Sequence, residues 1–211
     1  MLRIDKDKIL IEGMDLSGKT TIVDQLSSLI DKSVVRRRTI SEKSQIYDFT
    51  VAQSKAGTLH IDLISQLYKL AISEDLYNYQ PADEEIVLQD SYFALRSYAY
   101  AKEKGDNVLA QDIYKLLKLY PKPELTFYLT ATTEERLKRN QKRDKPMAYM
   151  EKLLLTNPHR FESIESYLKD ITTSLFNAEI INTQDRTSEE IALYIFNKIN
   201  DLRKDERNGR E

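Results

Sequence analysis

Short runs of apolar and β-branched residues alternate along the chain with longer segments in which apolar residues recur every three or four positions. The short runs are typical of buried strands, and the longer segments are typical of helices that bury one face. The expected strands span residues 8–12, 34–38, 86–89, 125–129 and 179–182. Five strands separated by helices predict an α/β fold, with a five-stranded parallel sheet covered by helices on both faces.

The segments between these strands predict the helices. We expect helical structure over 19–30, then up to about 78, up to about 119, from about 134 onward, and over 189–202. Pro121 and Pro123 end the helical pattern before the fourth strand, and Thr187–Glu190 has the form of a capping box before the last helix. No repeat and no linker rich in proline, glycine or serine divides the chain, so we expect one domain over residues 1–211.

The composition excludes several classes of protein. Hydrophobic residues make up 41% of the 211 residues and charged residues 31%, with a net charge of -2, so no excess of positive charge indicates a nucleic-acid or membrane partner. The absence of cysteine excludes disulfides and a thiolate zinc site. The first apolar run, Ile9–Ile11, is too short for a signal peptide or a membrane span. We therefore expect a cytoplasmic protein.

A phosphate-binding motif follows the first expected strand. Residues 13–20 read G-x-x-x-x-G-K-T, and we call them the phosphate loop. Its two glycines allow the backbone N–H groups to surround a phosphate at the start of a helix, Lys19 supplies a charge to the β- and γ-phosphates, and Thr20 is the expected Mg²⁺ ligand. ATP and Mg²⁺ are the expected cofactors. The expected nucleotide-binding residues are Gly13, Asp15, Ser17, Gly18, Lys19, Thr20 and Thr21, of which Thr21 either binds or packs.

The stretch Glu12–Thr21, E-G-x-D-x-x-G-K-T-T, resembles the thymidylate kinase family of nucleoside monophosphate kinases. The resemblance implies a P-loop kinase fold and transfer of the γ-phosphoryl group of ATP to a (deoxy)nucleoside monophosphate. It also implies that Asp15 holds the 3′-hydroxyl of the acceptor sugar. A hydrogen bond within the loop is the alternative role for this carboxylate.

Further segments are similar to the same family. Residues 86–92 resemble its strand ending in D-R-Y or D-R-H, residues 121–129 its P-K-P-D-L strand, and residues 180–183 its last strand. At the end of the third strand, Asp90 is positioned to act in catalysis or to reach the metal, and a helix cap is the alternative role. Thr20 and Asp90 are therefore the expected metal-linked residues.

A cluster of basic residues matches the place of the family's mobile lid, which we expect at about 139–158. It consists of Arg136, Lys138, Arg139, Lys142, Arg143 and Lys145. Such a density of charge is favourable where it faces phosphates, and the alternative is a solvated end of a helix. We expect Arg139 and Arg143 to stabilise the transition state, with Lys142 as a weaker candidate. Lys19, Asp90, Arg139 and Arg143 are thus the expected catalytic residues.

The chain departs from the family around the acceptor. Ser91 stands where the family has a phosphate-binding arginine, and Arg96, one helical turn further on, and Arg38, at the end of the second strand, are the two candidates to replace it. A solvated strand end is the alternative for Arg38, and strand alternation predicts that Arg36 and Arg38 share one face while Arg37 takes the other. Among several aromatic residues nearby, Tyr68 and Tyr92 are the leading candidates for stacking on a base, with a role in the core as the alternative.

These observations favour an ATP-dependent, thymidylate kinase-like phosphotransferase with a small-molecule nucleotide substrate. One alternative is a kinase of the same fold that acts on a nucleoside or another small metabolite, because the family's surest phosphate ligands are missing. Another is a nucleotide-binding switch or ATPase with no acceptor. The helices around 60–80 and 91–104 are candidate surfaces for a homodimer, although their apolar content fits a core equally well.

Overall fold

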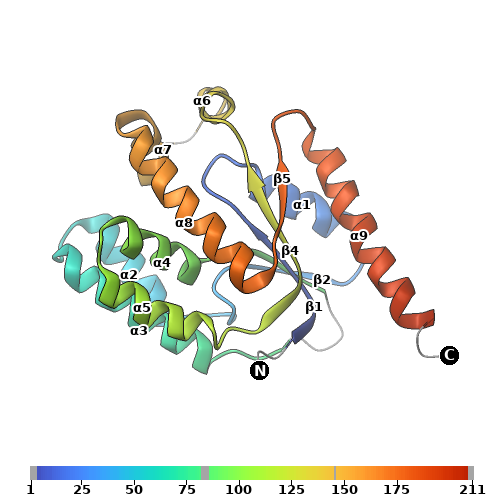
Figure 1. The fold of residues 1–211 in the computed structure, drawn as a ribbon, viewed down its shortest axis with the longest axis horizontal. Helices are drawn as coiled ribbons and strands as arrows, with labels where there is room; N and C mark the ends of the chain where they lie inside the picture. The colour runs from blue at the N-terminus through green and yellow to red at the C-terminus, as the bar shows by residue number, and fades with distance from the viewer. Residues whose placement is uncertain (1–3, 82–85, 145, 209–211) are drawn as a thin grey trace.

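The computed structural model describes residues 4–81, 86–144 and 146–208. Its centre is one parallel sheet in the order β2-β3-β1-β4-β5, as Figure 1 shows. The strands are β1 (Ile4–Glu12), β2 (Ser33–Arg38), β3 (Ile86–Tyr92), β4 (Lys122–Thr130) and β5 (Glu179–Asn182). All five predicted strands and their parallel pairing are confirmed.

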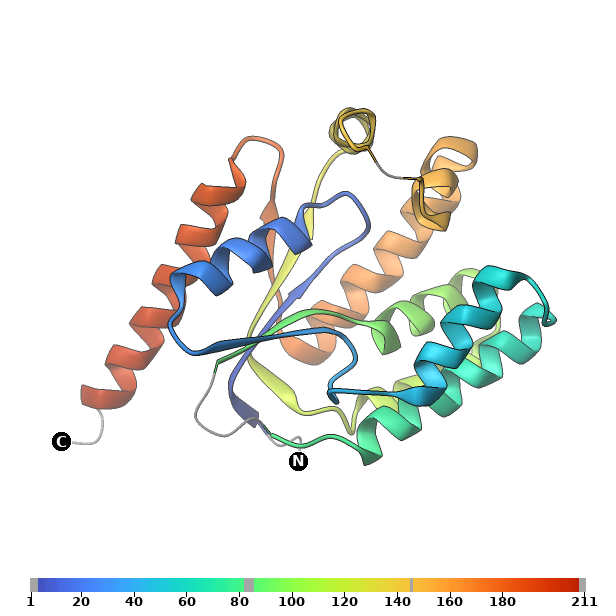
Figure 2. The ribbon, with the colours of Figure 1, turned by 180° about the vertical axis from the view of Figure 1, so that it is seen from behind.

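Helices cover both faces of this sheet (Figures 1 and 2). On one face, α1 (Lys19–Leu29) and α9 (Ser188–Asn208) pack against the apolar side chains of β1, β3 and β4. A second group of helices packs on the opposite face. It consists of α2 (Gln45–Ala56), α3 (Ile61–Tyr77), α4 (Phe93–Glu103), α5 (Asn107–Leu117) and α8 (Pro158–Phe176).

The central strand shows why the sheet is buried on both sides. Ile9 and Ile11 of β1 enter the core formed with α1 and α9, whereas Leu10 enters the core on the opposite face, and all three are at most 1% exposed. Successive side chains of a strand point to opposite faces, so a doubly covered strand must be apolar at every position. This explains the short continuous apolar runs in the sequence.

The strand order places the carboxyl ends of β1 and β3 side by side, with β2 beyond β3. The ends of β2 and β3 carry an unusual backbone: Arg38 has φ 70° and Ser91 has φ 60°. Left-handed conformations are uncommon for residues other than glycine, and such strain concentrates at functional sites. Both residues line the cavity described below.

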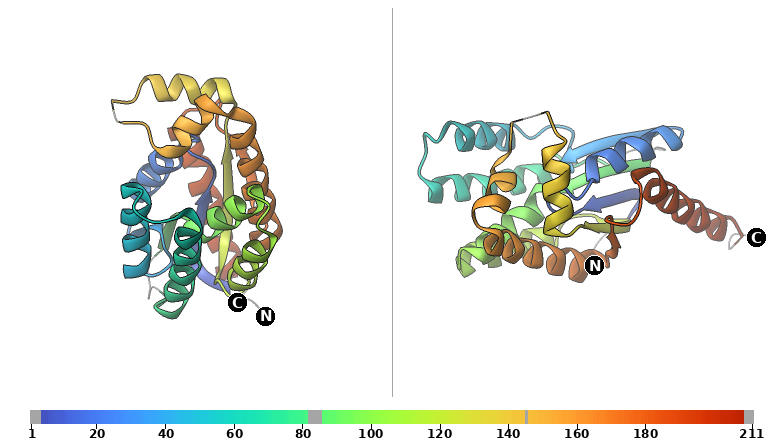
Figure 3. Two further views of the ribbon diagram at one scale, coloured as in Figure 1. Left: turned by 90° about the vertical axis from the view of Figure 1, so that its left-hand side faces the viewer. Right: turned by 90° about the horizontal axis from the view of Figure 1, so that it is seen from above.

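The lid region contains two short helices, α6 (Thr133–Gln141) and α7 (Tyr149–Thr156), beyond the carboxyl edge of the sheet (Figures 1 and 3). Sequence analysis predicts helical structure from about residue 134 onward. The structure divides this segment into α6, α7 and α8, and α7 ends where α8 begins, at Asn157. The last helix also extends beyond its predicted end at 202. None of the helices in the described ranges is long and apolar enough to cross a membrane.

Candidate active site

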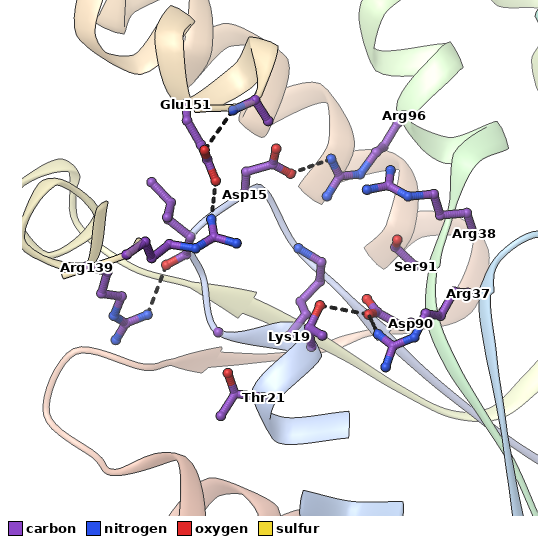
Figure 4. Close-up of a pocket in the computed structure, with 15 residues that line it drawn as sticks. Asp15, Lys19, Thr21, Arg37, Arg38, Asp90, Ser91, Arg96, Arg139 and Glu151 are labelled. Carbon is purple, nitrogen blue, oxygen red and sulfur yellow. Dashed lines mark hydrogen bonds and ion pairs between the residues drawn. The ribbon is translucent and has the colours of Figure 1, made fainter. Parts of the chain in front are cut away.

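A cavity of about 460 Å³ opens at the carboxyl edge of the sheet, where β1 and β3 end. Its charged lining comprises six cations and three anions. The cations are Lys19, Arg37, Arg38, Arg96, Arg139 and Arg143, and the anions are Asp15, Asp90 and Glu151. Figure 4 shows these side chains around one space. The excess of positive charge is suited to a polyanionic occupant.

The phosphate loop turns sharply between β1 and α1. Gly13 has φ 146° and Gly18 has φ 94°, conformations that residues with a Cβ rarely adopt. A Cβ atom on Gly13 would lie 2.3 Å from the carbonyl oxygen of Leu129 in β4. The loop therefore rests directly on the backbone of the neighbouring strand. Helix α1 begins immediately after Gly18, so its N-terminus faces the cavity.

Lys19 lies within this curved loop. Its Nζ atom donates a hydrogen bond of 2.9 Å to the carbonyl oxygen of Met14. Burial lowers the pKa of Lys19 to about 8, and the nearby Arg96 guanidinium acts in the same direction, whereas Asp15 and Glu12 partly oppose the shift. A phosphate placed beside this ammonium group would favour its charged form.

The side chains of Thr20 and Asp90 contact each other in the lining of the cavity. The Thr20 hydroxyl donates a hydrogen bond of 2.9 Å to Oδ2 of Asp90. Both are hard oxygen donors, which suit Mg²⁺ when phosphate oxygens and water complete its shell. In the described part of the chain, no group of three or more His, Cys, Asp or Glu residues could hold a metal ion. The two oxygen donors of Thr20 and Asp90 fit a magnesium ion whose other ligands are phosphate oxygens and water.

Arg96 supports the phosphate loop from α4. Its guanidinium donates to Oδ1 of Asp15 at 2.7 Å and to the carbonyl oxygen of Gly13 at 2.8 Å. Burial alone would raise the pKa of Asp15, but Arg96 and Lys19 together hold it well below its usual value. The Asp15 carboxylate is therefore ionised and can accept hydrogen bonds. Arg96 reaches the predicted region, but its Nη1 and Nη2 atoms already donate to the loop.

Glu12 lies behind the loop and is fully buried. Its carboxylate accepts hydrogen bonds from the backbone N–H groups of Gly13 and Tyr92, each at 2.9 Å. Burial raises the pKa of Glu12, although Arg96 and Lys19 act against this shift. One carboxylate thus fixes the ends of β1 and β3 relative to each other.

The three consecutive arginines of β2 divide between the two faces of the sheet. Arg36 is buried, donates to the carbonyl oxygens of Ile40 and Gln80, and lies beside the ring of Tyr79. Arg38 lines the cavity on the same side, next to Tyr47 of α2. Arg37 lies on the side of α1, where it pairs with Asp90 at 2.8 Å and with Asp24 at 2.7 Å. The prediction that Arg36 and Arg38 share one face while Arg37 takes the other is therefore confirmed.

The two candidates for base stacking lie outside the cavity lining. Tyr92 is 0% exposed and packs in the core, with its ring centroid 5.4 Å from that of Tyr120. This burial overturns the stacking role expected for Tyr92. Tyr68 packs beside Tyr47 and Phe93, with ring centroids 6.3 Å and 6.4 Å away. These three rings form a wall next to Arg38 rather than an open surface of the cavity.

Arg136 of α6 is fully buried, in contrast to the solvated or phosphate-facing roles considered for the basic cluster. It donates to the carbonyl oxygens of Ala131 and Asp15, each at 2.9 Å, and forms an ion pair with Glu165 of α8. The aromatic ring of Phe161 lies 5.1 Å below the guanidinium. Arg136 therefore joins the phosphate loop to two helices and does not face the cavity.

Arg139 joins the phosphate loop to the end of β5. It donates to the carbonyl oxygen of Leu16 at 3.1 Å and to that of Thr183 at 2.7 Å. Arg143 pairs with Glu151 of α7, a buried carboxylate that also accepts from the Ala148 N–H group at the start of that helix. Both arginines line the cavity as predicted from the lid resemblance.

The remaining members of the basic cluster differ in position. Lys138 is exposed and pairs with Glu134 one helical turn away, which matches the solvated alternative. Lys142 is exposed and does not line the cavity, and Lys145 lies outside the described residues. Gly13 and Ser17 are buried beneath the lining, and Thr21 belongs to it.

Sequence analysis did not predict the positions of three residues that lie in or beside the site. Arg37 could have been placed from the sheet register, because it lies opposite Asp90 on the adjacent strand. Glu151 lies within the predicted lid, eight positions after Arg143, but a single acidic residue in an exposed helical pattern gives no signal. Arg136 was hidden among its basic neighbours, since composition does not distinguish a buried cation from a solvated one.

Comparison with known proteins agrees with this geometry. A family model described as thymidylate kinase matches residues 11–192. The chain belongs to the thymidylate kinase family. Within the family, a probable thymidylate kinase from Methanosphaera stadtmanae is 24% identical over 195 residues, which cover 87% of this chain and 94% of the relative.

Two solved structures share the fold. A thymidylate kinase from Candida albicans has a TM-score of 0.72 at 20% identity, covering 96% of this chain and 94% of that one. A deoxyadenosine kinase from M. mycoides with bound dATP has a TM-score of 0.61 at 17% identity, covering 92% and 99%. The architecture is the P-loop kinase fold, and family membership makes this protein a nucleotide kinase.

The lowered pKa of Lys19 leads to a pH dependence of nucleotide binding. Above a pH of about 8 the free protein loses the Lys19 proton, so binding of the ADP phosphates must recover it from solution. We expect ADP affinity to fall as pH rises from about 8 to 9.5, by up to about tenfold per unit for one proton. Calorimetry in buffers of different ionisation enthalpy measures the proton uptake.

Lys19→Arg is the control for this pH dependence, because arginine remains charged throughout the range. Its ADP affinity should not fall across the same interval. Equal affinities at about pH 7.5 and 9.5 in the unaltered protein, with no proton uptake, would contradict the assignment.

The buried position of Arg136 leads to a stability prediction. Arg136→Met leaves Glu165 and two carbonyl oxygens without their partner, and we expect a loss of about 3–5 kcal/mol in the free energy of unfolding. Denaturant unfolding measures this loss. Adding Glu165→Gln removes the unpaired charge and should restore part of it. A loss of less than about 1 kcal/mol in the single variant would show that the network does not stabilise the fold.

Proposed function

We propose that this protein transfers the γ-phosphoryl group of Mg²⁺-bound ATP to a (deoxy)nucleoside monophosphate, which yields the diphosphate. The observation that supports this most directly is the charge of the cavity, where six cations face three anions. A phosphate loop needs few of these cations for one nucleotide, and the remaining arginines lie on the side of β2, α4 and the lid. Two phosphorylated substrates account for this distribution.

The donor is held at the phosphate loop. The backbone N–H groups at the start of α1 and the Lys19 ammonium group bind the β- and γ-phosphates. Thr20 and Asp90 would hold the magnesium ion, which neutralises charge on the phosphates when it is bound. Because phosphoryl transfer needs little covalent participation from the protein, these residues act by positioning and by electrostatic stabilisation.

The acceptor lies on the opposite side of Asp15. Arg38 is the leading ligand for its phosphate, since no carboxylate in the described ranges forms an ion pair with Arg38. Arg96 lies in the same wall, but it shares its donors with Asp15 and Gly13. The ionised Asp15 carboxylate would accept a hydrogen bond from a sugar hydroxyl.

The lid arginines complete the site. Arg139 and Arg143 line the cavity on the side of the phosphate loop and would stabilise charge on the transferred group. The lid at about 139–158 opens for exchange of substrates and closes to exclude water. Only Nη1 of Arg143 pairs with Glu151, so its other donors would bind a phosphate in the cavity.

A nucleoside acceptor is the second candidate, favoured by two observations. Ser91 offers no charge where an arginine is expected in the family, and Arg96 is engaged with the phosphate loop. The structural neighbours also include a deoxyadenosine kinase. A neutral acceptor would need Asp15 and Asp90 for its hydroxyl groups and would not need Arg38.

The decisive experiment is a panel assay of ADP formation from ATP and Mg²⁺ with nucleoside monophosphates, nucleosides or buffer alone. We expect stimulation by a monophosphate, and Lys19→Ala should lower kcat by about a hundredfold or more. Stimulation by nucleosides alone would establish the second candidate. ATP turnover in buffer alone that no acceptor increases would indicate an ATPase. Normal turnover by Lys19→Ala would exclude both proposed kinase activities.

Arg38→Ala should raise the acceptor KM by about ten- to a hundredfold, the effect of losing a charge-assisted hydrogen bond of about 1.5–3 kcal/mol to a phosphate. The KM for ATP should stay unchanged, because Arg38 lies on the acceptor side. Steady-state kinetics with each substrate varied in turn measures both constants. Lys142→Ala removes the same charge from an exposed position outside the cavity and serves as the control. Unchanged acceptor kinetics in Arg38→Ala would contradict its assignment.

A further inference from the structure

Arg37 connects two carboxylates that lie on different elements. Its Nη1 atom is 2.8 Å from Oδ2 of Asp90 at the end of β3, and its Nη2 atom is 2.7 Å from Oδ1 of Asp24 in α1. Figure 4 shows the Arg37 guanidinium directed at Asp90, beside the start of α1. One side chain thus bridges the inside of the cavity and the protein surface.

The oxygen that Arg37 occupies is the one that Thr20 also contacts. Oδ2 of Asp90 accepts the Thr20 hydroxyl at 2.9 Å and the Arg37 guanidinium at 2.8 Å. A divalent cation held between Thr20 and Asp90 would therefore meet a positive charge already at hydrogen-bonding distance from the same oxygen. Two cations at such a distance repel each other strongly where water is partly excluded. A metal and the guanidinium would therefore compete for this carboxylate oxygen.

We propose that Arg37 is a built-in counter-ion that competes with the divalent metal for Asp90. When the metal and nucleotide bind, Arg37 leaves Asp90 and keeps only its bond to Asp24. This inference rests on the proposed function, because that function places the metal at Thr20 and Asp90.

The burial of the three residues supports such an exchange. The Asp90 side chain is 9% exposed, so it requires a partner from the protein in the absence of a metal. Arg37 and Asp24 are 47% and 58% exposed, so their side chains can move at little cost in packing. Two nearby cations already have other partners. Arg36 donates hydrogen bonds to the carbonyl oxygens of Ile40 and Gln80, and Lys19 donates one to that of Met14.

The two contacts of Arg37 predict effects of opposite sign. Arg37→Gln removes the competing charge from Asp90 and should strengthen metal binding. Asp24→Asn removes the carboxylate that would still hold Arg37 after it leaves Asp90. Separating Arg37 from Asp90 then costs more free energy, and metal binding should weaken. A merely structural role for Arg37 would not strengthen metal binding in Arg37→Gln, because loss of the ion pair would then leave Asp90 less well positioned for the metal.

The experiment measures Mn²⁺ binding at saturating ADP, with free Mn²⁺ determined by electron paramagnetic resonance at constant ionic strength. The affinity of each variant for ADP is first measured with EDTA, so that saturation is known, and thermal unfolding checks the fold. We expect the Mn²⁺ Kd to fall about five- to twentyfold in Arg37→Gln and to rise about three- to tenfold in Asp24→Asn, within the range of coupling between neighbouring sites. An unchanged or larger Kd in Arg37→Gln would overturn the proposal.

Thr20→Val separates this inference from the proposed function. If it abolishes Mn²⁺ binding while Arg37→Gln leaves the Mn²⁺ Kd unchanged, the metal is at Thr20 as proposed and only the role of Arg37 fails. If Mn²⁺ binds equally well to Thr20→Val, the metal lies elsewhere, and both the metal placement and the competition are overturned. Loss of binding in Thr20→Val together with the opposite shifts in the other two variants supports both.

Discussion

The curvature of the phosphate loop is maintained by two buried arginines that donate to its backbone from different helices. Arg96 of α4 bonds the carbonyl oxygen of Gly13, and Arg136 of α6 bonds that of Asp15. Carbonyl groups turned toward these cations direct the peptide units of the loop, so that N–H groups at the start of α1 face the cavity, which is the orientation that phosphate binding requires. The walls of the cavity formed by α4 and α6 are thus both attached to the same short stretch of backbone.

The same principle extends to the charges that face the cavity. Each of its three carboxylates has an arginine partner: Asp90 with Arg37, Asp15 with Arg96 and Glu151 with Arg143. These pairs stabilise the site without substrates, when six cations would otherwise repel one another. Substrate phosphates therefore compete with resident anions for some of these arginines, and binding exchanges one set of ion pairs for another.

The sequence predicted the sheet, the phosphate loop and most of the cavity lining because these depend on local patterns. A buried strand must be apolar, and a loop that surrounds a phosphate must have glycine at Gly13 and Gly18. The failures concern side-chain direction. Tyr92 reads as an aromatic residue near the site but lies in the core, and the left-handed turn at Arg38 could not be inferred from residues that normally avoid it. Arg136 needed the tertiary structure, because only its surroundings distinguish it from its solvated neighbours.

The left-handed residues at the ends of β2 and β3 have an evolutionary consequence. Arg38 and Ser91 each store strain of the order of 1 kcal/mol or more, and both form the wall of the cavity. Glycine at either position would relieve the strain and raise thermal stability while it removed a side chain from the cavity wall. Selection of this protein for heat resistance alone would therefore tend to change the lining of this cavity, because stability and the shape of the cavity are opposed at these two positions.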